Sequence, residues 1–180
     1  LRGCMTDLQA IRLIQAKAEQ WEMDENLLLA FAKVESSFQS AATRYEPNWR
    51  YYLDVERFAE MSGVSKETER VQQATSFGLM QIMGSVCREL GYTGKLAELI
   101  ARPDMCLDVC LKKLKRIMER FDNEDFVIAA WNAGTPKKDA NGKFINKVYV
   151  DKVQDALRRL RAIDAIDASA IKKAVNQKGA

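Results

Sequence analysis

Residues 26–38 read NLLLAFAKVESSF, an apolar run that ends in a carboxylate and two hydroxyls. Leu28, Phe31 and Glu35 are spaced three and four positions apart, so a helix that begins after Asp24 places all three on one face. Burial on such a face disfavours the charged form of a carboxyl group and raises its pKa, which suits a general acid near neutral pH. The alternative is that Glu35 lies at the helix end and points into water. Helical spacing alone favours that alternative, so the decision depends on the rest of the chain.

The composition excludes several classes of enzyme and binder. The 180 residues suit one domain, and a net charge of +3 is too small to mark a nucleic-acid binder. The sequence contains no histidine, which excludes Ser-His-Asp and Cys-His catalysis in their usual forms and any His-ligated zinc site. We therefore expect no metal and no cofactor, and carboxylates must carry any chemistry.

The sequence also bears on location and redox state. No apolar run approaches the roughly 18 residues of a membrane span, and the start of the chain has no signal-peptide core. We expect no membrane span, and an export signal that is absent or already removed. The four cysteines are Cys4, Cys87, Cys106 and Cys110. Small buried thiols are favoured over a disulfide of Cys87 with Cys106 or Cys110, although connectivity cannot be deduced from sequence.

Capping residues and helical periodicity run through almost the whole chain. We expect helices over 6–21, 25–37, 48–63, 65–74, 84–91, 103–121, 124–131 and 149–160. Residues 75–84 are apolar and contain two glycines, which indicates buried irregular chain, and Asn141-Gly142 indicates a hairpin-like turn. No convincing strand is present, so we predict an all-α fold. The domain is expected over residues 1–163, with a tail or short extra helix over 164–180.

Four segments resemble, in family order, the motifs of soluble lytic transglycosylases. Residues 26–38 resemble the first motif, in which a Glu-Ser pair ends an apolar helix. TSFGLMQIMG at 75–84 resembles the second, built around Gly-Leu-Met-Gln, and AAWNAG at 129–134 resembles the third. YVDKV at 149–153 resembles the tyrosine-bearing fourth motif. Each motif alone is weak evidence, but four in order identify the chain as similar to this family over most of its length.

The resemblance implies a lysozyme-like helical fold with a groove for a glycan strand of peptidoglycan. It also implies that Glu35 protonates the β-1,4 bond between N-acetylmuramic acid and N-acetylglucosamine. The same residue then accepts the proton of the sugar's own 6-hydroxyl, which gives a 1,6-anhydro product. A retaining glycosidase needs a second carboxylate about 5 Å away and an inverting one a more distant base. An intramolecular acceptor needs neither, so one buried glutamate is sufficient.

Six further residues are implied as substrate-binding by their place in the motifs: Ser36, Gly78, Met80, Gln81, Asn132 and Tyr149. Ser36 is expected to hydrogen-bond and orient the Glu35 carboxylate, or else to cap the helix end. Gly78 is expected to allow close backbone approach, or else only a turn. Met80 is expected to line the groove, or else to belong to the core.

The remaining three have the stronger functional expectation. Gln81 is expected to line the groove and reach a sugar or the catalytic carboxylate. Asn132 is expected to bind an acetamido or hydroxyl group, and otherwise ends a helix. Tyr149 is expected to place its hydroxyl near Glu35, and otherwise is one more aromatic side chain on an amphipathic helix.

The chain departs from compact family members between the first two motifs. An insertion over about residues 44–73 separates them and resembles the longer connection in some bacteriophage transglycosylases, so a virion is a candidate location. This insertion could wall the groove or recognise stem peptides. Its acids include Glu46, Asp54 and Glu56. Some goose-type lysozymes place acids in this region and hydrolyse the bond, which keeps hydrolysis as an alternative.

Two readings from other classes compete with the enzyme. A non-catalytic glycan-binding or virion module is one, although binding alone does not require a buried acid. A helical nucleic-acid module is the other, based on the basic residues of 112–120 and 158–161, which are better explained as solvated helix faces. We expect a monomer that binds peptidoglycan and no nucleic acid, with a periplasmic or extracellular site of action.

Overall fold

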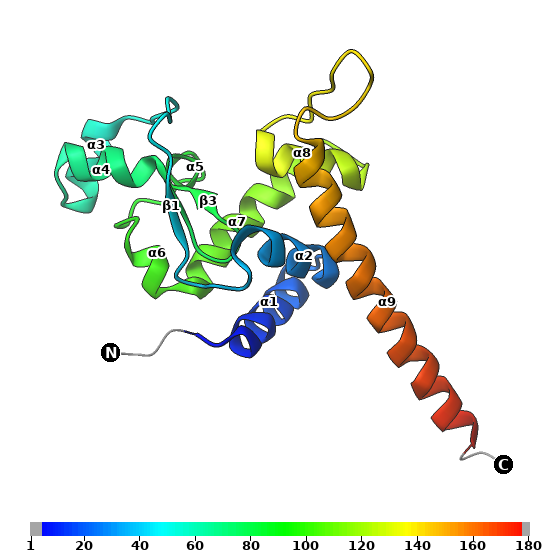
Figure 1. Ribbon diagram of the computed structural model, residues 1–180. Helices are drawn as coiled ribbons and strands as arrows, with labels where there is room; N and C mark the ends of the chain where they lie inside the picture. Colours follow the sequence, from blue (N-terminus) through cyan, green and yellow to red (C-terminus); the bar gives the residue numbers. More distant parts are fainter. Residues whose placement is uncertain (1–4, 178–180) are drawn as a thin grey trace.

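The computed structural model describes the backbone of residues 5–177 and the side chains of residues 5–166 (Figure 1). Helices dominate this part of the chain, as the sequence predicts. In chain order they are α1 (Asp7–Trp21), α2 (Glu25–Ser36), α3 (Val55–Ser62), α4 (Lys66–Gln73), α5 (Gly84–Glu89), α6 (Glu98–Ala101), α7 (Pro103–Met118), α8 (Glu124–Ala133) and α9 (Lys147–Gln177). A capping box of Thr6 and Gln9 opens α1, and Asn123 caps α8.

Helix α2 lies at the centre of the domain, where it packs against α1 and α9 (Figure 1). Asp24 caps it and accepts hydrogen bonds from the backbone N–H groups of Asn26 and Leu27. Residues 27–32 are all buried, and full burial of a large apolar side chain contributes about 1.5–3 kcal/mol. The last turn of α2, which carries Glu35, is therefore held on a rigid support.

Residues 75–84 are mostly buried, as predicted, but they are not irregular. Strands β2 (Thr75–Phe77) and β3 (Ile82–Met83) pair antiparallel, and β1 (Thr43–Tyr45) pairs with the other edge of β2. The sheet order is β1-β2-β3, with Thr43 opposite Phe77 and Ser76 opposite Met83. Strands of two or three residues are too short to show the alternation by which a strand is recognised in sequence.

The expected helix over 48–63 is the largest correction. Helix α3 begins only at Val55, where the Asp54 carboxylate accepts a hydrogen bond from the N–H of Arg57. Residues 48–54 form a loop instead, and the aromatic side chains that imitate a helical stripe belong to this loop. Helix α4 follows, close to the expected helix over 65–74, and Ser65 caps it.

The short helix α6 is not among the expected helices, but from α7 onward the chain follows the prediction closely until its last helix. Pro103 opens α7, where its missing N–H removes no hydrogen bond. The polar segment before α9 contains a bridge between Lys138 and Phe144, which closes the predicted turn at Asn141-Gly142. Helix α9 runs without a break past residue 163 (Figure 1). The division of the chain at that residue stays a prediction.

Two expectations concern the interior and the membrane. Cys87, Cys106 and Cys110 are buried free thiols, as predicted, and burial raises the pKa of Cys87 and Cys110. Cys4 lies outside the described residues. No helix in the described part of the chain is long and apolar enough to cross a membrane.

Candidate active site

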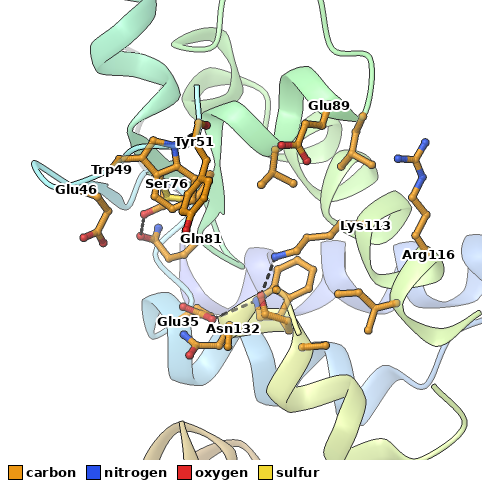
Figure 2. A pocket seen from close by; sticks show the side chains of 18 of the residues that line it. Glu35, Glu46, Trp49, Tyr51, Ser76, Gln81, Glu89, Lys113, Arg116 and Asn132 are labelled. Atoms are coloured by element: carbon orange, nitrogen blue, oxygen red, sulfur yellow. Dashed lines mark hydrogen bonds between the residues drawn. The ribbon is translucent and has the colours of Figure 1, made fainter. Parts of the chain in front are cut away.

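A groove of about 720 Å³ runs between the loop after β1 and helix α8. Its size is that of a typical ligand site. The last turn of α2, the β2–β3 hairpin, α5 and α7 complete its walls. Figure 2 shows Glu35 and Asn132 on one side of the opening and the rings of Trp49 and Tyr51 on the other.

Glu35 is half-buried in this groove and is held through one oxygen. Its Oε1 accepts a hydrogen bond from Tyr149 Oη at 2.6 Å and one from Trp131 Nε1 at 3.2 Å. Burial raises the pKa of Glu35, and these two donors together with the charges of Lys113 and Arg44 reduce that rise. The carboxyl group therefore keeps its proton to a higher pH than an exposed glutamate does. A raised pKa is the property that general acid catalysis near neutral pH requires. Once deprotonated, the carboxylate keeps two donors that stabilise its charge.

Tyr149 is a fixed donor toward Glu35. It lies in the first turn of α9, and burial together with the nearby Glu35 carboxylate raises the pKa of its hydroxyl. Because the phenol stays protonated at any working pH, it donates to Glu35 whether the carboxyl group is charged or neutral. Helices α2 and α9 pack directly together, which brings these two side chains, 114 residues apart in sequence, into contact.

Lys113 and Trp131 are parts of the site that the sequence analysis missed. The Nζ of Lys113 lies 3.9 Å from the centre of the Trp131 ring and donates to the Trp131 carbonyl oxygen at 2.8 Å. Burial lowers the pKa of Lys113 to about 8. The sequence analysis assigned Lys113 to a solvated face. The signal against that reading is its spacing after Cys106 and Cys110, which continues a buried stripe of α7.

Ser36 does not orient the Glu35 carboxylate as expected. Its hydroxyl donates to the carbonyl oxygens of Leu79, at 2.8 Å, and Ala32, at 3.2 Å. The contact with Leu79 ties the end of α2 to the turn between β2 and β3. Ser36 therefore fixes the distance between two walls of the groove.

Gly78 and Met80 belong to the turn between β2 and β3 and shape it from within the protein. Gly78 has φ +73°, and a Cβ at this position would lie 2.7 Å from Cys106 Sγ, so both positive φ and close approach favour glycine. Met80 is fully buried, which corrects the expectation that it lines the groove. It is a core residue that anchors the turn.

Gln81 lines the groove, but its amide is engaged within the protein. Nε2 donates to the carbonyl oxygens of Gly78 at 2.9 Å and Ala42 at 3.1 Å, while Oε1 accepts from the Ser76 hydroxyl at 2.8 Å. The side chain thus braces the hairpin against the segment before β1. It has no hydrogen bond to Glu35 among the contacts of the described residues.

Asn132 is exposed in the groove near Glu35 (Figure 2). Asn146 Nδ2 donates to the Asn132 Oδ1 at 3.1 Å and also to the Ala129 carbonyl oxygen at 3.0 Å. This contact fixes the orientation of the Asn132 amide and turns its NH₂ group away from Asn146. Asn132 can therefore offer two N–H donors to a ligand.

The insertion supplies one wall of the groove. Of its acids Glu46, Asp54 and Glu56, only Glu46 lies in that wall. Glu46 lines the groove and forms an ion pair with Arg44 at 2.6 Å. Asp54 caps α3, and Glu56 is paired with Lys66 on the surface. No group of three or more metal-ligating side chains occurs within the described residues.

A family model described as "Transglycosylase SLT domain" matches residues 12–146, three quarters of the chain, and spans the first three motifs. No curated protein and no solved structure matches.

Proposed function

The chain belongs to the transglycosylase SLT domain family, whose members are peptidoglycan lytic transglycosylases, and we propose that Glu35 is its single catalytic acid and base. The proposed reaction cleaves the β-1,4 bond between N-acetylmuramic acid and N-acetylglucosamine and leaves a 1,6-anhydro end. The observation that carries the proposal is a half-buried carboxyl group in the groove, bound by two donors through one oxygen only.

The first step is protonation of the glycosidic oxygen. Because Oε1 of Glu35 already accepts hydrogen bonds from Tyr149 and Trp131, the acid proton belongs on Oε2. Transfer of this proton releases the N-acetylglucosamine hydroxyl and leaves Glu35 as a carboxylate. Both donors then stabilise a full negative charge, and such charge-assisted hydrogen bonds are about twice as strong as neutral ones.

The second step closes the anhydro ring. The positive charge at C1 of the muramyl sugar is stabilised by that sugar's own acetamido group. The 6-oxygen bonds to C1, and its proton passes to Glu35, which restores the acid for the next turnover. Asn132, with an exposed amide near Glu35, is proposed to hold an acetamido or hydroxyl group of the substrate during both steps.

Hydrolysis of the same bond is the second candidate function. Hydrolysis needs a base that activates water. Of the insertion acids Glu46, Asp54 and Glu56, Glu46 lines the groove and is the candidate for this base. The ion pair with Arg44 occupies one oxygen of Glu46, which leaves only the other free to approach a water molecule. A non-catalytic glycan-binding module is less consistent with the site, because binding does not need an acid that is costly to ionise.

Members of this family act on peptidoglycan, outside the cytoplasm. For this chain we further propose a periplasmic or extracellular site of action, which it could reach as part of a bacteriophage virion. We also propose that the protein is a monomer and does not bind nucleic acid.

Substitution Glu35→Gln tests the catalytic assignment. The amide still accepts hydrogen bonds from Tyr149 and Trp131 but cannot donate an acid proton. We expect release of soluble fragments from purified peptidoglycan to fall at least about 10²–10⁴-fold, while binding to sedimented peptidoglycan is retained. Glu46→Gln is the matched control, and it should leave release near the wild-type rate. Wild-type release by Glu35→Gln would refute the assignment, and loss of release in Glu46→Gln would favour hydrolysis.

A further inference from the structure

Two aromatic side chains of the insertion line the groove, one half-buried (Trp49) and one exposed (Tyr51). Trp49 and Tyr51 both line it, with ring centroids 5.4 Å apart and planes at 75° (Figure 2). Tyr51 is 73% exposed, although aromatic side chains of this size usually bury most of their surface. The pair therefore offers a large apolar surface to whatever occupies the groove.

Hydrogen bonds within the protein hold the loop that carries the two rings in one conformation. The N–H of Trp49 donates to the Glu46 carbonyl oxygen at 3.0 Å, and Trp49 Nε1 donates to the Tyr51 carbonyl oxygen at 2.9 Å. The N–H of Glu46 donates to the Ala74 carbonyl oxygen at 2.8 Å. These bonds fix the orientation of the Trp49 ring before any ligand arrives, which reduces the entropy lost on binding.

A buried polar network anchors the far end of the same loop. Gln73, fully buried, holds Leu53 on both sides: its Oε1 accepts from the Leu53 N–H and its Nε2 donates to the Leu53 carbonyl oxygen, each at 2.8 Å. Gln73 Nε2 also donates to Glu69, whose carboxylate makes a two-point ion pair with Arg88 at 2.8 and 2.7 Å. Glu69 and Arg88 are both fully buried at their side chains. Loss of one member of such a buried, paired network strongly destabilises the folded protein. Because Gln73 links the loop to this network, the loop is held at a defined position.

The chemistry of this surface favours a sugar ring over a stem peptide. A pyranose has an apolar face of C–H groups that packs on an aromatic ring, whereas the carboxylates of a stem peptide need free cations. Among the groove-lining residues of 44–51, the one cation, Arg44, is paired with Glu46, whose carboxylate repels other carboxylates. Asn48, also in the groove wall, can hydrogen-bond to sugar hydroxyls.

We propose that Trp49 and Tyr51 form a saccharide-binding subsite that packs against one ring of the glycan strand, across the groove from Glu35. This inference rests on the proposed function, since it takes peptidoglycan glycan as the ligand. The subsite belongs to the insertion, so it adds contacts with the strand beyond those of the four motifs. It acts in binding and takes no part in proton transfer.

The test measures binding in the catalytically inactive Glu35→Gln background. The ligand is glycan strands from which an amidase has removed the stem peptides, and a parallel titration uses strands with their stems. Replacing both rings (Trp49→Ala with Tyr51→Ala) should weaken binding of stem-free strands about tenfold, the upper end for an aromatic contact. In the enzyme with Glu35 intact, the same pair should raise KM and leave kcat unchanged. The matched control is Tyr45→Ala, an exposed tyrosine of β1 that does not line the groove, and its binding should equal that of the parent.

Two outcomes would overturn the subsite. Unchanged binding of stem-free strands by the double variant would show that the rings do not contact sugar. A loss seen only with stem-bearing strands would assign them to peptide recognition instead. Melting temperatures within a few degrees of the parent would show that the exposed substitutions leave the fold intact. If the intact enzyme releases nothing from peptidoglycan, the proposed function fails, and the binding titration still reports on the subsite separately.

Discussion

Removal of one hydroxyl, in Tyr149→Phe, tests how the protein tunes Glu35. The Tyr149 hydroxyl donates to Glu35 Oε1 at 2.6 Å both before and after proton transfer, so only the strengthening of this bond counts toward the rate. A hydrogen bond to a charged group exceeds one to a neutral group by about 1–1.5 kcal/mol, which corresponds to roughly a five- to tenfold loss of kcat. The same hydrogen bond lowers the pKa of Glu35 against the effect of burial, so its loss must raise that pKa further.

The assay is the pH dependence of fragment release from purified peptidoglycan. Activity that requires protonated Glu35 declines on the alkaline side, and in Tyr149→Phe this decline should move to higher pH while the maximum falls. Tyr52→Phe is the control, because its ring stacks on Arg70 and does not line the groove. An unchanged maximum with an unmoved alkaline limb would refute the role given to Tyr149. So would a limb that moves to lower pH.

Three further predictions concern stability. The folded pKa of Glu35 lies above its unfolded value, so its contribution to stability is present at acidic pH and is lost as pH rises through the folded pKa. Glu35→Gln should therefore melt above the wild type at pH 7 and lose this advantage below about pH 4; equal melting at both pH values would contradict the raised pKa. Arg88→Met leaves Glu69 buried without its partner and should cost about 3–5 kcal/mol in urea unfolding, whereas a cost below 1 kcal/mol would mean that the ion pair is not buried. Gly78→Ala forces a Cβ against Cys106 Sγ at positive φ and should lower the free energy of unfolding by about 1–3 kcal/mol; a variant as stable as the parent would show that the turn can relax.

Much of the helical framework could be predicted because its signals are local. Asp24, Ser65 and Asn123 each cap the helix that follows them, and a cap is read from a few neighbouring residues. The apolar face below Glu35 is likewise read from positions three and four apart. The family, and with it the fold class and the enzyme class, followed from four motifs in order and is confirmed by the family model.

What could not be predicted depends on contacts between distant segments. Ser36 has the same local surroundings whether its hydroxyl faces Glu35 or Leu79, and only the packing of α2 on the β2–β3 turn decides. Lys113 is a charged residue in a basic run, and its burial arises because α8 places Trp131 against it. The aromatic residues of 48–54 imitate a helix face, but the loop is held by Gln73, a partner some twenty positions away in sequence.

The product of digestion tests the central claim most directly. Purified peptidoglycan is digested to completion with the wild-type protein, and the molecular masses of the soluble muropeptides are measured by mass spectrometry. The proposed mechanism predicts muropeptides with 1,6-anhydro ends, one water lighter than those with reducing ends, and none from the Glu35→Gln protein. Reducing ends released by the wild-type protein would contradict a reaction in which Glu35 acts alone, and would require a second groove carboxylate that activates water, with Glu46 the first candidate.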